Sequence, residues 1–214
     1  MNSIERHPLE PFLPERAQVL FLGSFPPPRK RWSMDFFYPN FINDHWRIEG
    51  QLFFNDRNHF VLPGRKAFDR EAVVTFCQQK GIAFYDTATA VRRLRDNASD
   101  EFLEVVEATD IRQLLRQLPL CRAIVTTGKK ATETVCASLG IPEVPKVNAS
   151  VPIPALDLVS PPPALAPVSH SPAQDAQPRR LVLYRLPSSS RAYPLPFDKK
   201  VAAYRSLFQS VGLL

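Results

Sequence analysis

The sequence predicts an α/β fold, a three-layer α/β/α sandwich with a mainly parallel central sheet. Two observations carry this prediction: short apolar runs alternate along the chain with longer segments of helical apolar spacing, and glycine follows several of these segments. Strands that alternate with helices pair in parallel through right-handed crossovers, and the helices then cover both faces of the sheet. The 214 residues, 44% of them hydrophobic, suit one domain over 1–214.

The first half of the chain supplies two of the expected strands. Residues 17–22 (AQVLFL) form a short apolar run that ends in Gly23 and predicts a buried strand followed by a loop. The loop contains three consecutive prolines, which fix φ and remove backbone donors, so its start is not helical. We expect helices over 42–53 and 67–80 and a second strand over 82–87.

The second half repeats this order. Residues 100–117 have a helical apolar period with one interruption and are expected to form a helix. A third strand is expected over 123–127 and a helix over 128–139. A last strand is expected over 181–186 and a closing helix over 196–211.

Residues 142–178 interrupt the pattern. Proline occupies ten of these 37 positions, glycine occupies none, and the second part has no apolar period. Such a composition favours extended chain that does not join a packed core. We therefore expect an extended surface insertion over about 158–178.

The charge is distributed unevenly. The formal net charge is +6, and residues 179–214 contain seven Lys or Arg against one Asp, so this end accounts for the whole excess. A concentrated basic segment indicates an anionic partner such as DNA. A solvated basic helix face is the alternative.

Several functional classes lack their signatures. No apolar run is long enough to span a membrane, and the first residues do not have the pattern of a signal peptide, so we expect a cytoplasmic protein. The three cysteines never form a CxxC pair, which favours buried free thiols. The four histidines show no metal-ligand spacing, and His45, beside a candidate loop, is expected to be a hydrogen-bonded structural residue. The hydrolase motif GxSxG is also absent.

Ligands of open α/β sheets bind outside the carboxyl ends of the strands. The loops expected there are 23–47, 86–97, 127–131 and 187–196. In the third loop, Lys129 and Lys130 follow a glycine at a helix start but lack the spacing of a nucleotide-binding phosphate loop. They can hold a phosphate of a nucleic-acid backbone, or the segment is a plain strand-to-helix turn.

Three segments carry a family resemblance. Residues 23–26 (GSFP), 35–47 (DFFYPNFINDHWR) and 186–193 (LPSSSRAY) resemble, in this order, motifs of the uracil-DNA glycosylase superfamily, and are closest to its hypoxanthine-DNA glycosylase branch. Residues 81–83 and 127–131 also match that branch. The chain departs from its pattern at 39–41, where the branch has Gly-His-Pro, and at 191–193, where it has Pro-Ala-Asn, so the excised base stays open.

The resemblance implies a uracil-DNA glycosylase-like fold and excision of uracil or hypoxanthine from DNA for base excision repair. Such an enzyme flips the base into a pocket and acts as a monomer without a metal or cofactor. Asn43 matches the asparagine that acts near the base or water, and Asp35 and Asp44 are alternative general bases. The implied residues are Asn43, Ser24, Ser189 and Ser190 for catalysis, Gly23, Phe25, Phe37, Tyr38 and Ser188 for the base, and Arg191, Lys129, Lys130 and Arg31 for DNA.

Two other functions are compatible with these residues. A catalytically silent protein of the same fold could bind nucleic acid through Arg29, Lys30, Arg31 and Trp32. An enzyme that hydrolyses free nucleosides would contact few phosphates, and its substrate binding would depend little on salt.

Overall fold

The computed structural model describes residues 3–95, 100–156, 158 and 179–214. Five strands form the central sheet, in the order β3-β2-β6-β8-β7. The first four are parallel, and β7 pairs antiparallel with β8 at one edge. Their bounds are Val19–Gly23 for β2, Ile82–Asp86 for β3, Ala123–Thr126 for β6, Ala149–Pro152 for β7 and Val182–Arg185 for β8.

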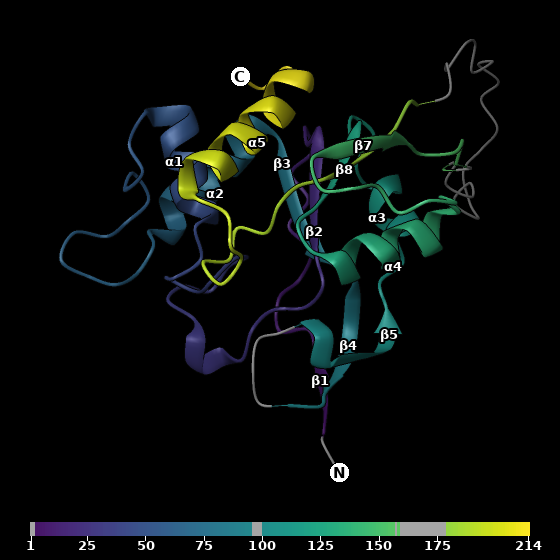
Figure 1. Cartoon of the computed structure of the whole chain (residues 1–214), viewed down its shortest axis with the longest axis horizontal. Coiled ribbons are helices and arrows are strands. Elements are labelled where there is room, and N and C mark those ends of the chain that lie inside the picture. Colours follow the sequence, from purple (N-terminus) through teal and green to yellow (C-terminus); the bar gives the residue numbers. More distant parts are fainter. Residues whose placement is uncertain (1–2, 96–99, 157, 159–178) are drawn as a thin grey trace, which may run out of the picture.

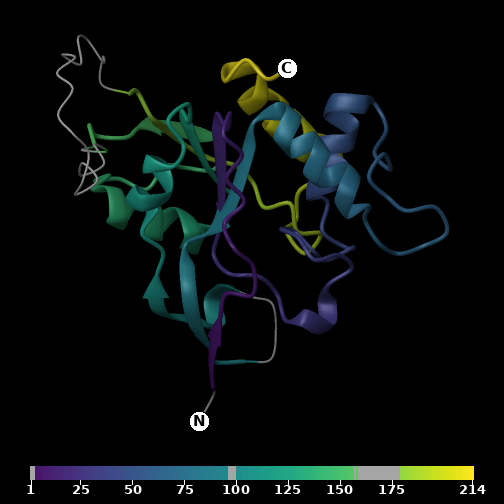
Figure 2. The same cartoon turned by 180° about the vertical axis from the view of Figure 1, so that it is seen from behind.

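Helices cover both faces of this sheet. One face carries α1, α2 and α5, and the other carries α3 and α4 (Figures 1 and 2). The predicted α/β fold with a mainly parallel sheet is therefore confirmed. The helices are α1 (His45–Phe54), α2 (Arg70–Lys80), α3 (Ile111–Arg116), α4 (Lys129–Leu139) and α5 (Phe197–Ser210), with short 3-10 turns η1 (Arg29–Arg31) and η2 (Asp100–Phe102).

The prediction of one helix over 100–117 is wrong. Residues Leu103–Ala108 form strand β5, and only α3 is an α-helix in this stretch. In β5, Val105 and Val106 are exposed instead of facing the core, so the apparent helical period does not mark a buried helix face. The strand is held by antiparallel pairing with β4 (Ala88–Arg93). Pairing with a distant strand here outweighs the local apolar pattern.

A second, antiparallel sheet was not predicted at all. It has the order β1-β4-β5, with β1 at Ile4–Arg6. It lies beyond the carboxyl ends of the parallel strands, below them in Figure 1. Its strand β4 begins two residues after β3 ends, which links the small sheet directly to the candidate loops.

Other differences are smaller. Helices α1 and α2 each begin three residues later than expected, and α2 begins after Asp69, whose side chain accepts from the backbone N–H of Ala72. Strand β7 lies inside the proline-rich stretch, as an edge strand with a proline at its end, where proline is tolerated. The insertion expected at 158–178 lies outside the described residues, except for residue 158.

Burial on both faces of the sheet explains why the parallel strands appear in the sequence as continuous apolar runs. Residues 19–22 of β2 and all five residues of β3 are buried, because helices cover both faces of the sheet. Phe21 of β2 and Phe84 of β3 stack side by side, with ring centroids 5.4 Å apart. Cys77, Cys121 and Cys136 are buried and free, as predicted. None of the described helices is long and apolar enough to cross a membrane.

Candidate functional site

A pocket of about 250 Å³ opens at the carboxyl ends of the parallel strands. Its wall includes Gly23 at the end of β2, Asp86 at the end of β3, Thr127 after β6 and Ser188 after β8. This is the edge of the sheet at which ligands of open α/β folds bind.

The pocket brings together the residues that the sequence singled out. All nine residues that the resemblance implied for catalysis or base contacts line it, although they come from three separate segments. The middle segment and the serine segment are bonded to each other, because Asn43 and Ser190 form an isolated β-bridge and the backbone N–H of Asp44 donates to the carbonyl of Ser189 at 3.0 Å. The roles of the nine residues stay predictions.

Aromatic rings form one wall of the pocket. Phe37, expected to stack on the base, is 5% exposed and stacks on Phe84 with 18° between the ring planes. Phe25 meets the ring of His7 edge-on at 5.3 Å. The core therefore fixes both predicted aromatic contacts before any ligand arrives.

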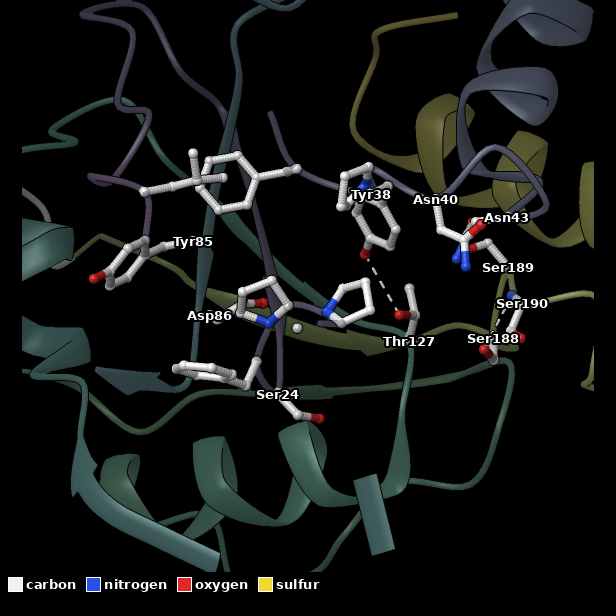
Figure 3. A pocket seen from close by; sticks show the side chains of 17 residues that line it. Ser24, Tyr38, Asn40, Asn43, Tyr85, Asp86, Thr127, Ser188, Ser189 and Ser190 are labelled. Carbon is white, nitrogen blue, oxygen red and sulfur yellow. Dashed lines mark hydrogen bonds between the residues drawn. The ribbon is translucent and has the colours of Figure 1, made fainter. Parts of the chain in front are cut away.

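Tyr38 connects two sides of the pocket. Its backbone has a φ of 50°, in the left-handed region, and its hydroxyl lies 3.4 Å from Oγ1 of Thr127. In Figure 3, Asn43 lies on one side of this contact together with Ser188, Ser189 and Ser190, and Asp86 and Tyr85 lie on the other. The pocket thus has two ends with different chemistry.

His45 stacks behind Tyr38, and it is not the hydrogen-bonded histidine that the sequence predicted. Its two ring nitrogens and both carboxyl oxygens of Glu49 are buried without a hydrogen-bond partner among the described residues. Burial lowers the pKa of His45 to about 3 and raises the pKa of Glu49 well above its usual value. His45 is therefore neutral at pH 7, and burial favours the neutral form of Glu49. Nε2 of His45 lies 3.7 Å from Oε1 of Glu49.

Asn43 is oriented by the start of α1. Its Oδ1 accepts a hydrogen bond from the backbone N–H of His45 at 2.9 Å. The side-chain NH₂ group has no partner among the described residues. Asn43 can therefore donate a hydrogen bond to a ligand in the pocket.

The two alternative general bases do not line the pocket. Asp35 is an exposed carboxylate paired with Arg29. Asp44 is buried and accepts from Nε of Arg191 at 2.8 Å, with Nζ of Lys200 at 3.6 Å. The carboxylate of Asp44 is thus in ion pairs with two cations. Its visible role is to anchor the serine segment, because Lys200 also donates to the carbonyl of Ser190 at 2.7 Å.

Sequence reasoning missed a pair of residues at the other end of the pocket. Asp86 lines the pocket, and its Oδ2 lies 2.9 Å from Nε2 of His7. An acidic residue at the carboxyl end of a buried strand was a signal for Asp86. The sequence contains no comparable signal for His7, which precedes every strand that was expected.

The predicted DNA contacts lie outside the pocket. The side chain of Lys129 is 77% exposed and sits 3.6 Å from Glu133, whereas Lys130 donates to the carbonyl of Leu103. Arg31 lies exposed in η1, and Arg191 lies next to the serine segment.

Part of the charge of the basic C-terminal end is used inside the protein. Arg179, Arg185 and Lys200 each donate to backbone carbonyls within the protein. Their charges serve internal contacts, and the exposed cations of this end include Arg191, Lys199 and Arg205.

Comparison with known proteins bears on the fold. No protein-family model matches the chain, and no curated protein matches it. A solution NMR structure from Methanosarcina acetivorans, named a candidate uracil DNA glycosylase, matches with a TM-score of 0.60. The match covers 98% of this chain and 99% of that one, at 20% sequence identity. The chain has the fold of that protein. The predicted uracil-DNA glycosylase-like fold is thus confirmed, and the hypoxanthine branch stays a prediction.

Proposed function

We propose that the protein is a monofunctional DNA N-glycosylase that removes a deaminated base, uracil or hypoxanthine, for base excision repair. One observation carries the proposal: the nine residues implied by three separate motifs line a single pocket at the ligand-binding edge of the sheet. The structural likeness to a candidate uracil DNA glycosylase supports it.

The pocket suits a flipped base. An extruded base is held by stacking on aromatic side chains and read by polar groups along its edge. Phe25 and Phe37 supply rigid rings, and the amides and hydroxyls that line the pocket supply the polar groups. Because these rings are fixed by the core, stacking costs little ordering of the protein.

Breaking the N-glycosidic bond places negative charge on the departing base and positive charge on the sugar. Donors that are fixed in advance stabilise such an anion without reorganising. The free NH₂ group of Asn43 and the hydroxyl of Ser190, whose oxygen accepts from the backbone N–H of Ala192 at 3.2 Å, lie at one end of the pocket and are donors of this kind. Ser189 is the third polar side chain at this end. In this proposal Asn43 stabilises the leaving base, and Ser24 orients the attacking water.

The DNA backbone stays outside the pocket and needs cations near its mouth. Arg191 is the cation best placed for this role, because Asp44 fixes its Nε beside the serine segment while 45% of the side chain remains exposed. Arg31, Lys129 and Lys130 are the further phosphate contacts in this proposal.

Incubation with lesion-containing DNA tests the function. Single-stranded and mismatched duplex oligonucleotides carry uracil, hypoxanthine or an undamaged base, and alkali-labile abasic sites are counted. Release of uracil or hypoxanthine, with none from the undamaged strand, is the expected result. Absence of abasic sites on every substrate would contradict the enzyme proposal.

A catalytically silent nucleic-acid-binding protein is the second candidate. It is favoured by the position of Asp35 and Asp44, because neither of these two candidate general bases lines the pocket. This protein would bind lesion-containing strands and release no base, so the same incubation combined with a binding measurement separates the two.

A further inference from the structure

A buried lysine of α5 contacts the serine segment. The side chain of Lys200 is 2% exposed, and its Nζ donates a hydrogen bond to the carbonyl of Ser190 at 2.7 Å. The same nitrogen lies 3.6 Å from Oδ2 of Asp44. Burying an ammonium group is costly unless the group is paired and hydrogen-bonded, and Lys200 meets both conditions. Its charge is therefore balanced inside the protein, and the side chain does not reach DNA.

Two local preferences of helices are broken where these charges meet. Asp44 directly precedes α1, a position at which an aspartate side chain usually accepts from a backbone N–H of the first turn. It makes no such bond, and Oδ1 of Asn43 accepts from the N–H of His45 instead. Lys200 lies in the first turn of α5, where the helix dipole disfavours a cation. The helix ends therefore explain neither side chain, whereas their mutual contact explains both.

The carboxylate of Asp44 also holds Arg191. Its Oδ1 accepts from Nε of Arg191 at 2.8 Å, and 45% of the arginine side chain is exposed. Nη1 and Nη2 of Arg191 form no hydrogen bond with any described residue. A guanidinium group binds a phosphate through two parallel N–H groups. Contact through Nε alone therefore fixes the guanidinium and leaves its two terminal nitrogens for a phosphate of the DNA.

The balance of charges decides how strongly Arg191 attracts that phosphate. The ion pair of Asp44 with Arg191 alone has no net charge, and its carboxylate repels a phosphate nearby. Lys200 adds a second positive charge on the other side of the carboxylate. With two cations against one carboxylate, one positive charge remains for the partner. Asp44 can therefore fix Arg191 without cancelling its attraction for DNA.

We propose that Lys200 is a positioning residue for DNA binding: it compensates the carboxylate of Asp44, so that Asp44 orients Arg191 toward a phosphate while the group keeps a positive charge. The inference rests on the proposed function, because it describes how the DNA contact of that function is made. The competing role is structural support, in which Lys200 only satisfies the carbonyl of Ser190.

Affinity for DNA tests this role. The probe is a single-stranded oligonucleotide with one uracil on a 2′-fluoroarabinose, which resists bond cleavage, and fluorescence anisotropy is measured at low salt, where screening is weak. Lys200→Gln removes the charge and keeps a hydrogen-bond donor. It is expected to weaken binding by about threefold to tenfold, although Lys200 is buried.

A matched control removes the same charge far from the pocket. Lys80 ends α2 and lies two residues before β3, so it is near the amino ends of the parallel strands, whereas the pocket is at their carboxyl ends. Lys80→Gln is expected to change the affinity by less than about twofold.

A second substitution at Asp44 separates charge compensation from structural support. Lys200→Gln combined with Asp44→Asn has the net charge of the unmodified protein, and the amide oxygen can still accept from Nε of Arg191. This double variant is expected to bind within about twofold of the unmodified protein, because one positive charge again remains. Structural support predicts no recovery, since the second change adds to the first.

The control for this recovery restores the net charge elsewhere. Glu15 is exposed and lies shortly before β2, at the amino ends of the parallel strands. Lys200→Gln combined with Glu15→Gln has the same net charge as the first double variant. Its affinity is expected to stay as low as that of Lys200→Gln, because the carboxylate of Asp44 is still uncompensated.

Lys200→Met tests the bond to the serine segment. Methionine lacks both the charge and the donor, so Lys200→Met and Lys200→Gln are expected to weaken DNA binding to the same extent. If Lys200 only supported the carbonyl of Ser190, Lys200→Met would weaken binding and Lys200→Gln would restore it. Melting curves show which variants are folded at the temperature of the measurement.

The test remains decisive if Lys200→Gln alone does not fold. Asp44→Asn is then expected to bind the oligonucleotide more tightly than the unmodified protein, and Asp44→Asn with Lys200→Gln to return to the unmodified affinity. An unchanged affinity after loss of the Lys200 charge, or a recovery by Glu15→Gln equal to that by Asp44→Asn, would overturn the role of Lys200.

The outcomes also separate this inference from the proposed function. If the affinities follow the expected pattern but no base is released from cleavable DNA, the role of Lys200 in DNA binding stands and the glycosylase proposal fails. If uracil or hypoxanthine is released and Lys200→Gln binds like the unmodified protein, the glycosylase proposal stands and the role of Lys200 fails.

Discussion

The ring of Tyr38 lies face to face on the ring of His45, with centroids 3.8 Å apart and 7° between the ring planes. Tyr38 lines the pocket, whereas His45 is fully buried at the start of α1. The stack therefore joins the pocket wall to a buried polar pair, His45 and Glu49. Because the histidine is neutral, the two rings can stack without burying a charge.

The first prediction concerns acid stability. His45 has a folded-state pKa of about 3, below its unfolded value of 6.5. Its neutral form stabilises the fold fully above pH 6.5, and this contribution is lost as the pH falls toward 3, by up to about 1.4 kcal/mol per pH unit. Replacement of His45 by Gln should flatten this loss. Urea unfolding of both proteins between pH 4 and pH 7 measures how much stability each loses. An equal loss in the two proteins would contradict the lowered pKa of His45.

The second prediction concerns the alkaline side. The pKa of Glu49 is raised by burial, so its stabilising contribution is full below the unfolded pKa and is lost as the pH rises through the folded pKa. Tyr204 and Cys77 stay neutral in the folded protein because burial raises the pKa of both. Glu49→Gln should therefore remove part of the loss of stability that sets in as the pH rises above the unfolded pKa of a glutamate, and His45→Gln should not. The same unfolding series gives both results.

The third prediction concerns Gly23. A methyl group at this position would lie 2.3 Å from Oδ1 of Asp86, whose carboxylate is held by His7. Gly23→Ala should displace the carboxylate, lower the unfolding free energy by about 1–3 kcal/mol and weaken binding of lesion-containing DNA. In an Asp86→Ser background, Gly23→Ala should lower the unfolding free energy by less, because the oxygen atom that clashes with the methyl group is absent. An equal loss of unfolding free energy in both backgrounds would show that Gly23 is not there to make room for the carboxylate of Asp86.

The sequence was informative where burial is continuous. The runs in β2, β3 and β6 are apolar because helices cover both faces, and this alone predicts parallel strands and places the site at their carboxyl ends. Strand β5 is exposed at five of six positions and is stabilised by its pairing with β4. The apolar pattern of a short segment does not predict such a pairing with another part of the chain.

Two features of the site depend on contacts between distant positions. His7 and Asp86 are 79 residues apart in the chain, and only the approach of the N-terminal segment to β3 makes them a pair. The count of basic residues in 179–214 likewise does not reveal which of them are used internally, as Arg179 and Arg185 are when they donate to backbone carbonyls. The sequence gives the net charge, but the fold determines how many of the basic side chains are free to contact a partner.

The fourth prediction concerns DNA affinity. Arg191 keeps part of its guanidinium exposed beside the pocket, so Arg191→Ala should weaken binding to all sequences alike and reduce the slope of log affinity against log salt by about 1. Arg116→Ala is the control, because this exposed arginine ends α3 and does not line the pocket. Fluorescence anisotropy at several salt concentrations measures both. An unchanged slope for Arg191→Ala would exclude a phosphate contact.

The central claim is that Asn43 helps to break the N-glycosidic bond of a base held in the pocket. The most direct measurement is the single-turnover rate of uracil and hypoxanthine release from single-stranded DNA by the unmodified protein and by Asn43→Ala, with DNA affinity measured in parallel. Loss of one fixed donor to a developing anion costs about 10²–10³ in rate, so a fall of that size with affinity within about twofold is expected. Release of neither base by the unmodified protein, or an unchanged rate in Asn43→Ala, would contradict the claim.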